Sequence, residues 1–144
     1  MEKFIKKYGL WILGLAAIIV FVVFAVKKGW FKDKAAEIDP KTASKDGSEV
    51  TISDSQAQNM AKGIHDQLIN YANFFDSNGL ITKMQPLVNM TDSNLVVVAN
   101  KYASMYAGEE MNTLSSALAG EYLGWGEVNS MRDRLVGRLT ELGV

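Results

Sequence analysis

The chain has 144 residues, no cysteine and a formal net charge of −1, a size that allows one modest domain with an appendage and excludes a fold braced by disulfides. Its charge is uneven, because residues 1–50 carry nine lysines against six acidic residues, whereas residues 51–144 carry six basic and ten acidic residues. The acidic balance of the longer part argues against nucleic acid as a partner.

Residues 8–26 form the most distinctive segment, because these 19 consecutive residues carry no charge. As a helix they would span roughly 28 Å, close to the hydrocarbon thickness of a bilayer. A cleaved signal peptide would also begin with lysines, but this apolar run is long and ends in Lys27 and Lys28 without a small-x-small cleavage pattern. A buried core helix would show a polar stripe, which this segment lacks. We therefore predict a retained single-pass membrane anchor within residues 1–31.

Aromatic and basic residues flank the predicted span, as they do at membrane interfaces. The residues that we expect at the two interfaces are Tyr8, Trp11, Lys27, Lys28, Trp30 and Phe31. Three lysines precede the span and six follow it within about 20 residues, so the positive-inside rule favours a cytoplasmic C-terminal part. In the membrane of a virion, inside and outside would need to be redefined.

Residues 32–53 have few large apolar side chains, one proline and many charges, a composition typical of a solvated linker. As a flexible coil of about 20 residues, the segment would reach roughly 25 Å and hold the following domain clear of the lipid. A polybasic lipid-binding segment is the alternative interpretation. Five acidic residues are interleaved with the lysines, which disfavours it.

Residues 54–144 show helical periodicity, beginning with a long amphipathic helix. Ser53 and Gln56 have the spacing of a capping box that would start this helix. The residues on its apolar face are Ala57, Met60, Ala61, Ile64, Leu68, Tyr71, Ala72 and Phe75. The "DSNG" stretch at 76–79 predicts a bend, in which Asp76 or Ser77 caps the second helix and Asn78 or Gly79 adopts a left-handed backbone conformation. The second helix would bury Leu80, Ile81, Met84, Leu87 and Val88.

Three further helices are expected. Thr91 or Asp92 would cap the third, whose inward residues are Leu95, Val98, Ala99, Tyr102, Met105 and Tyr106. Glu109 and Glu110 would begin the fourth, where acidic residues complement the helix dipole, and Gly120 would end it. Its buried edge would be Met111, Leu114 and Leu118. The fifth would run from about 126 to 142 and bury Val128, Met131, Leu135, Leu139 and Leu142.

This pattern predicts an all-α domain of five helices over residues 54–144. The string "NKYASMYAGEEMNTLSSALAGEY" resembles an annexin repeat, in which a third helix ends in aromatic-x3-aromatic-Gly and a fourth in Leu-x3-Leu-x-Gly-x-aromatic. The matching residues are Tyr102, Tyr106, Gly108, Leu114, Leu118, Gly120 and Tyr122, with one extra residue before the first glycine. The resemblance implies a right-handed superhelix of five helices, a fold that binds anionic phospholipid through calcium in typical annexins.

The calcium ligands of such repeats are not retained. The family uses a Gly-x-Gly-Thr loop and an acidic residue before the last leucine of the fourth helix, but the loop here reads "FFDSNG" and Ala117 takes the acidic position. An EF-hand interpretation also fails, because Phe74 and Gln85 stand at its first and twelfth positions. Asp76 and Asn78 are the remaining candidate metal ligands, and we interpret their stretch as a turn without a metal.

No catalytic pattern and no cofactor motif is recognisable. The single histidine, His65, lies beside Asp66 at the edge of an apolar stripe, where a histidine is usually structural or exposed. The chain has no Gly-rich phosphate loop and no nucleophile elbow. We therefore expect a protein that is not an enzyme.

Two hypotheses about function follow. In the first, the protein is a structural or interaction protein anchored in a bilayer, whose helical domain docks on a protein partner or on copies of itself. It would be a minor component of a larger membrane-associated assembly, for instance a membrane-containing phage virion. In the alternative, it is a calcium- or lipid-responsive annexin-like module that binds membranes. The first is favoured, because a covalently attached membrane helix makes calcium-driven recruitment redundant.

Overall fold

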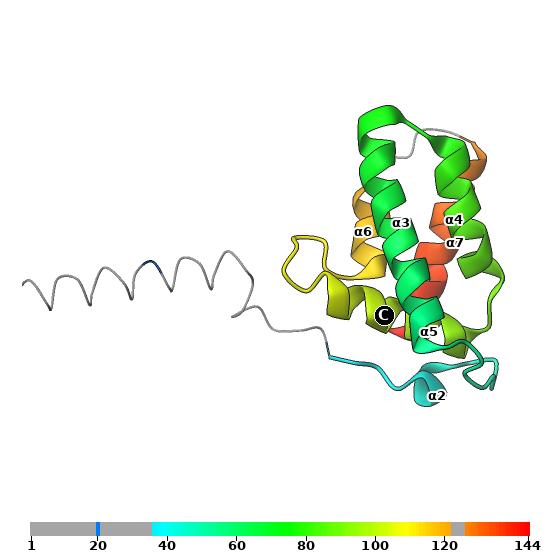
Figure 1. The fold of residues 1–144 in the computed structure, drawn as a ribbon. Coiled ribbons are helices and arrows are strands. Elements are labelled where there is room, and N and C mark those ends of the chain that lie inside the picture. Colours follow the sequence, from blue (N-terminus) through cyan, green and yellow to red (C-terminus); the bar gives the residue numbers. More distant parts are fainter. Residues whose placement is uncertain (1–19, 21–35, 122–125) are drawn as a thin grey trace, which may run out of the picture. The chain divides into compact units, whose positions relative to one another are not determined.

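The computed structural model of the protein describes residue 20, residues 36–121 and residues 126–144 (Figure 1). Within these ranges the helices that follow residue 20 are α2 (Pro40–Ala43), α3 (Asp54–Phe74), α4 (Ser77–Asn89), α5 (Asp92–Met105), α6 (Leu114–Gly120) and α7 (Glu127–Leu142). The described ranges contain no strand. The all-α class predicted from the periodicity is confirmed.

The predicted membrane span at residues 8–26 lies outside the described residues except for Val20. The same holds for the predicted interface residues Tyr8, Trp11, Lys27, Lys28, Trp30 and Phe31. Among the helices in the described part of the chain, none combines the length and the apolar character needed to cross a bilayer.

The starts of α3 and α5 agree with the sequence pattern. The backbone N–H of Gln56 donates to Ser53 Oγ at 3.2 Å, and the backbone N–H of Ser53 donates to Gln56 Oε1 at 2.8 Å. The predicted capping box is therefore confirmed. Thr91 is the N-cap of α5 but its side chain accepts no capping hydrogen bond, and the acidic Asp92 follows in the first turn.

The start of α6 differs from the prediction. Thr113 Oγ1 accepts a hydrogen bond from the backbone N–H of Ser116 at 3.1 Å, so the helix begins at Leu114. Glu109 and Glu110 lie in the loop before it and do not begin the helix. The reason is that a hydroxyl that accepts a free backbone N–H fixes a helix start more strongly than the favourable placement of an acidic side chain.

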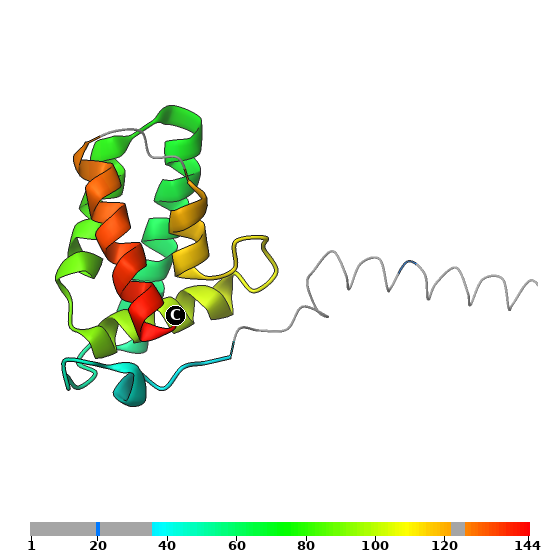
Figure 2. The same ribbon diagram turned by 180° about the vertical axis from the view of Figure 1, so that it is seen from behind.

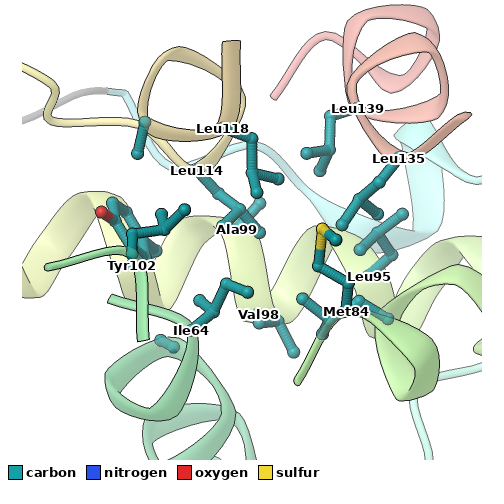
Figure 3. Close-up of a cluster of buried hydrophobic side chains, with 14 of the residues drawn as sticks. Ile64, Met84, Leu95, Val98, Ala99, Tyr102, Leu114, Leu118, Leu135 and Leu139 are labelled. Carbon is teal, nitrogen blue, oxygen red and sulfur yellow. The ribbon is translucent and has the colours of Figure 1, made fainter. Parts of the chain in front are cut away.

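The five helices from α3 to α7 surround one apolar core. Figures 1 and 2 show α3, α4, α6 and α7 running alongside one another while α5 crosses one end. Neighbouring contacts join α3 with α4, α4 with α7, and α6 with α7. Figure 3 shows Leu95 and Ala99 of α5 among side chains from the other helices. Ile64, Leu118 and Leu135 have no exposed surface, as the periodicity predicted.

Three residues that the pattern placed in the core are exposed. Ala72 lies outside the apolar stripe of α3, next to the buried Tyr71. Phe75 is 73% exposed, because it ends α3 in a left-handed conformation with φ 55° that turns its side chain away from the stripe. Met111 is 39% exposed, because it precedes α6 instead of belonging to it.

Residues 38–52, which composition indicates as part of a linker, lie along α5. Asn100 accepts a hydrogen bond from the backbone N–H of Ile38 at 3.1 Å and donates to the carbonyl of Ile38 at 2.6 Å. Ser93 Oγ donates to a backbone carbonyl of this segment at 2.6 Å, and Asn94 Oδ1 accepts a backbone N–H from it at 2.8 Å. We call residues 38–52 the polar strap. Side-chain hydrogen bonds to backbone hold it, and composition does not reveal such bonds.

An arginine on α7 connects several elements at the end of the fold where the strap lies. Arg138 donates to the carbonyls of Val88 at 2.8 Å and Met90 at 3.0 Å, and to Asp92 Oδ1 at 2.6 Å. Asp92 Oδ2 accepts the backbone N–H groups of Lys45 and Asp46 at 3.2 Å each. The end of α4, the start of α5, α7 and the strap are thus connected through one ion pair.

Candidate functional site

The bend between α3 and α4 contains the predicted cap. Asp76 Oδ1 accepts the backbone N–H of Gly79 at 3.0 Å, and Asp76 Oδ2 accepts a hydrogen bond from Gln67 Nε2 at 3.0 Å. The capping role predicted for Asp76 is confirmed. The left-handed residue is Phe75, so the prediction of Asn78 or Gly79 for that conformation is wrong.

Gly79 serves the bend in another way. A Cβ atom at this position would lie 2.2 Å from Asp76 Oδ2 and 2.4 Å from Gln67 Nε2. The carboxylate therefore needs the space above the glycine in order to cap the helix. Both of its oxygens already accept N–H donors, so a cation at Asp76 would compete with these bonds.

The other candidate ligands lie apart. Asn78 is exposed, and its backbone carbonyl accepts a hydrogen bond from Thr82 Oγ1 at 2.8 Å. Ala117, at the position of the annexin carboxylate, is only 4% exposed on α6. Within residues 36–121 and 126–144, no group of three or more histidine, cysteine or acidic side chains is placed to hold a metal ion.

The structure brings His65 together with two tyrosines and a glutamate. Its Nδ1 lies 3.0 Å from the Tyr102 hydroxyl, and its ring stacks on Tyr106 with 3.7 Å between centroids. Its Nε2 lies 3.6 Å from Glu109 Oε1. Burial, followed by the charge of Glu109, raises the pKa of Tyr102, so this hydroxyl stays protonated at neutral pH. His65 is thus oriented by partners on both ring nitrogens.

Beside this cluster lies a groove of about 250 Å³, which we call the α3–α6 groove. Its apolar lining is Leu68 and Ile69 of α3, Ala117 of α6 and Met111 of the preceding loop. Its polar lining is His65, Tyr102, Glu109, Glu110 and Glu121. The described lining residues therefore combine an apolar surface with three carboxylates, and no lysine or arginine is among them. Such a surface suits a cationic group on an apolar stem.

Sequence reasoning missed this groove. His65 and Ile69 stand four residues apart on α3, and Tyr102 of α5 stands four residues before Tyr106, the C-cap of that helix, so each pair shares one helix face. The spacing predicts which residues share a helix face, but it does not predict that these faces of α3 and α5 contact each other. The contribution of Met111 is not visible in the pattern either, because the spacing predicts this residue on the buried edge of a helix.

A second hollow of about 410 Å³ lies between the strap and α5. Part of its polar lining is already occupied: Lys101 forms an ion pair with Asp54, and Asn100 binds the backbone of Ile38. Its lining carries two carboxylates, Glu37 and Asp54, and one lysine that already pairs with Asp54, so the hollow is less one-sided in charge than the α3–α6 groove.

Comparison with protein-family models, with curated proteins and with solved structures finds no match to this chain.

Proposed function

We propose that the protein is a non-enzymatic, single-pass membrane-anchored interaction protein and a minor component of a larger membrane-associated assembly. The observation that carries this proposal is the charge-free run of 19 residues from Tyr8 to Val26, with aromatic and basic residues at both ends. The lysine bias favours the cytoplasmic side for the helical domain, or the corresponding side of a virion membrane.

The short length of chain between the proposed span and the helical part supports a domain that works close to its membrane. Only nine residues, 27–35, separate the proposed span from the first described residue of the helical part. At 3.3–3.6 Å per residue, a fully extended chain between residues 26 and 36 reaches about 35 Å. Partners of the domain are therefore sought within the same assembly and near the bilayer surface.

For the helical domain we propose the organisation of a single annexin-like repeat without calcium ligands. The support is the order of five helices and the burial of Tyr102, Leu114 and Leu118, three residues of the family pattern. Ala117 and the bonded carboxylate of Asp76 favour a role in packing and docking over one in calcium sensing. In this organisation, the exposed surfaces between neighbouring helices are available for contacts with other proteins.

Membrane fractionation of full-length variants tests the anchor. Two arginines, Ala16→Arg with Val20→Arg, each cost about 2.5–3.5 kcal/mol at the centre of a span and should move the protein toward the soluble fraction. The matched variant, Ala16→Leu with Val20→Leu, should stay with the membranes as the wild type does. Equal distribution of both variants, or a soluble wild type, would contradict the proposal.

Purification of the full-length chain from its membranes in a mild detergent tests the interaction role. We expect a stable complex of defined stoichiometry, with another membrane-associated protein or with further copies of the chain. The chain could instead be extracted as a free monomer at every detergent concentration that keeps other complexes intact. That result would contradict the interaction function but not the membrane anchor.

A further inference from the structure

The α3–α6 groove has an apolar surface that remains open to solvent. Ile69 is 50% exposed and Met111 is 39% exposed, while Leu68 and Ala117 in the same lining are buried. Gly120 lets Met111 lie against α6, because a Cβ atom there would come 2.5 Å from the Met111 methyl carbon. The thioether thus lines the groove against α6, and the half-exposed Ile69 of α3 is another part of its apolar lining.

The charge of the groove is one-sided. Glu109 lies near His65, whereas the described residues provide no lysine or arginine ion pair for Glu110 or Glu121. The arginine nearest in the chain to Glu121 is Arg132, which donates to its backbone carbonyl at 2.9 Å and is held by Asp133 through its other nitrogens. Glu110 and Glu121, two carboxylates for which the described residues supply no matching cation, favour a positively charged occupant.

We propose that the α3–α6 groove is the docking site for a partner protein segment that presents an arginine or lysine between apolar residues. The methylene stem of the basic side chain lies between Ile69 and Met111, and its cationic head reaches Glu110 and Glu121. Apolar neighbours in the segment cover the exposed parts of Ile69 and Met111. This inference rests on the proposed interaction function and names the chemistry of the partner.

One basic side chain is the occupant that fits best. A volume of about 250 Å³ lies below the range of about 300–1,000 Å³ typical of pockets for drug-sized molecules, but it accommodates one long side chain. An anionic lipid headgroup would meet like charges at this rim, and an acidic segment would be repelled in the same way. A neutral apolar segment would leave the carboxylates without partners.

The test uses the full-length chain with 13C-labelled methionine methyl groups, in buffer or in a phosphatidylcholine nanodisc according to its fractionation. The probe is the blocked peptide Gly-Leu-Arg-Leu-Gly, compared with peptides carrying Gln for Arg or Ser for both Leu. We expect a saturable shift of the Met111 signal, assigned with Met111→Leu. The signals of the buried Met84 and Met131 should stay constant. Each peptide replacement should weaken binding about tenfold.

Variants identify the carboxylates that carry the effect. Glu110→Gln with Glu121→Gln should weaken binding of the arginine peptide about 4- to 25-fold, because two exposed charge pairs are lost and each contributes a factor of about 2–5. Glu49→Gln, an exposed glutamate on the strap, is the matched control and should leave binding unchanged. Thermal unfolding should be the same for all these variants.

Several outcomes would overturn the inference: no Met111 shift with any peptide, equal binding of the arginine and glutamine peptides, or equal binding by the double variant and the control. These outcomes are distinguishable from failure of the proposed function. If the arginine peptide binds to a chain found in the soluble fraction, the docking site is supported and the membrane anchor is contradicted. If the chain stays in the membranes and no peptide binds in the groove, the anchor is supported and the docking site is contradicted.

Discussion

Replacing Arg138 by methionine should strongly destabilise the helical domain. The arginine donates two hydrogen bonds to carbonyls at the end of α4 and a charge-assisted one to Asp92. The first two contribute about 1 kcal/mol each and the third about 1.5–3 kcal/mol. The side chains of Arg138 and Asp92 are 29% and 15% exposed, so water replaces part of the loss. We therefore expect unfolding free energy to fall by about 2–4 kcal/mol.

Urea unfolding followed by far-ultraviolet circular dichroism measures this change. Methionine keeps much of the apolar stem, so the comparison isolates the guanidinium group. Arg134→Met is the matched control, because Arg134 is an exposed residue of the same helix, and its effect should stay within about 0.5 kcal/mol. A double-mutant cycle with Asp92→Asn should show coupling. If Arg138→Met and Arg134→Met have equal midpoints, or if the cycle shows no coupling, the account of this junction is wrong.

Three further predictions concern single positions. Gly137→Ala should stabilise the domain by about 0.5–1 kcal/mol in thermal unfolding, because a Cβ atom there meets open space in α7. Gly79→Ala should instead destabilise it by about 1 kcal/mol, because the added Cβ displaces the Asp76 carboxylate that caps α4. Equal melting temperatures of the two alanine variants would refute this reasoning. Hydrogen bonds from the Ser48 side chain and the Asp92 backbone hold the pKa of Asp46 below its usual range. The stability that the ionised Asp46 side chain adds to the folded state is therefore present above about pH 4 and is lost at lower pH. Asp46→Asn should reduce the loss of thermal stability between about pH 5 and about pH 3. If the melting temperature of the variant falls with pH as steeply as that of the wild type, this role of Asp46 is wrong.

The sequence predicted those parts of the fold that depend on local periodicity. The apolar faces of α3, α4, α5 and α7 follow three- and four-residue spacings, and the capping box at Ser53 follows from two residues. The strap was missed because Asn94 and Asn100, more than 40 residues away, supply its hydrogen bonds. No local composition records such distant partners.

The candidate site was less accessible to sequence reasoning. Asp76 could be recognised as a cap, because a carboxylate at the start of a helix has a local role. The α3–α6 groove depends on a tertiary arrangement, in which the loop residue Met111 lies over Gly120 while His65 stacks on Tyr106. Assigning Met111 to a helix removed it from the surface where the structure places it.

The central claim is that residues 8–26 hold the protein in a bilayer. Alkaline extraction of native membranes, followed by mass spectrometry of the protein in pellet and supernatant, measures it most directly. We predict that the protein stays in the pellet and that peptides from before residue 8 are detected in it, which shows that the segment is retained. Release into the supernatant, or a mature chain that begins after residue 26, would contradict the account.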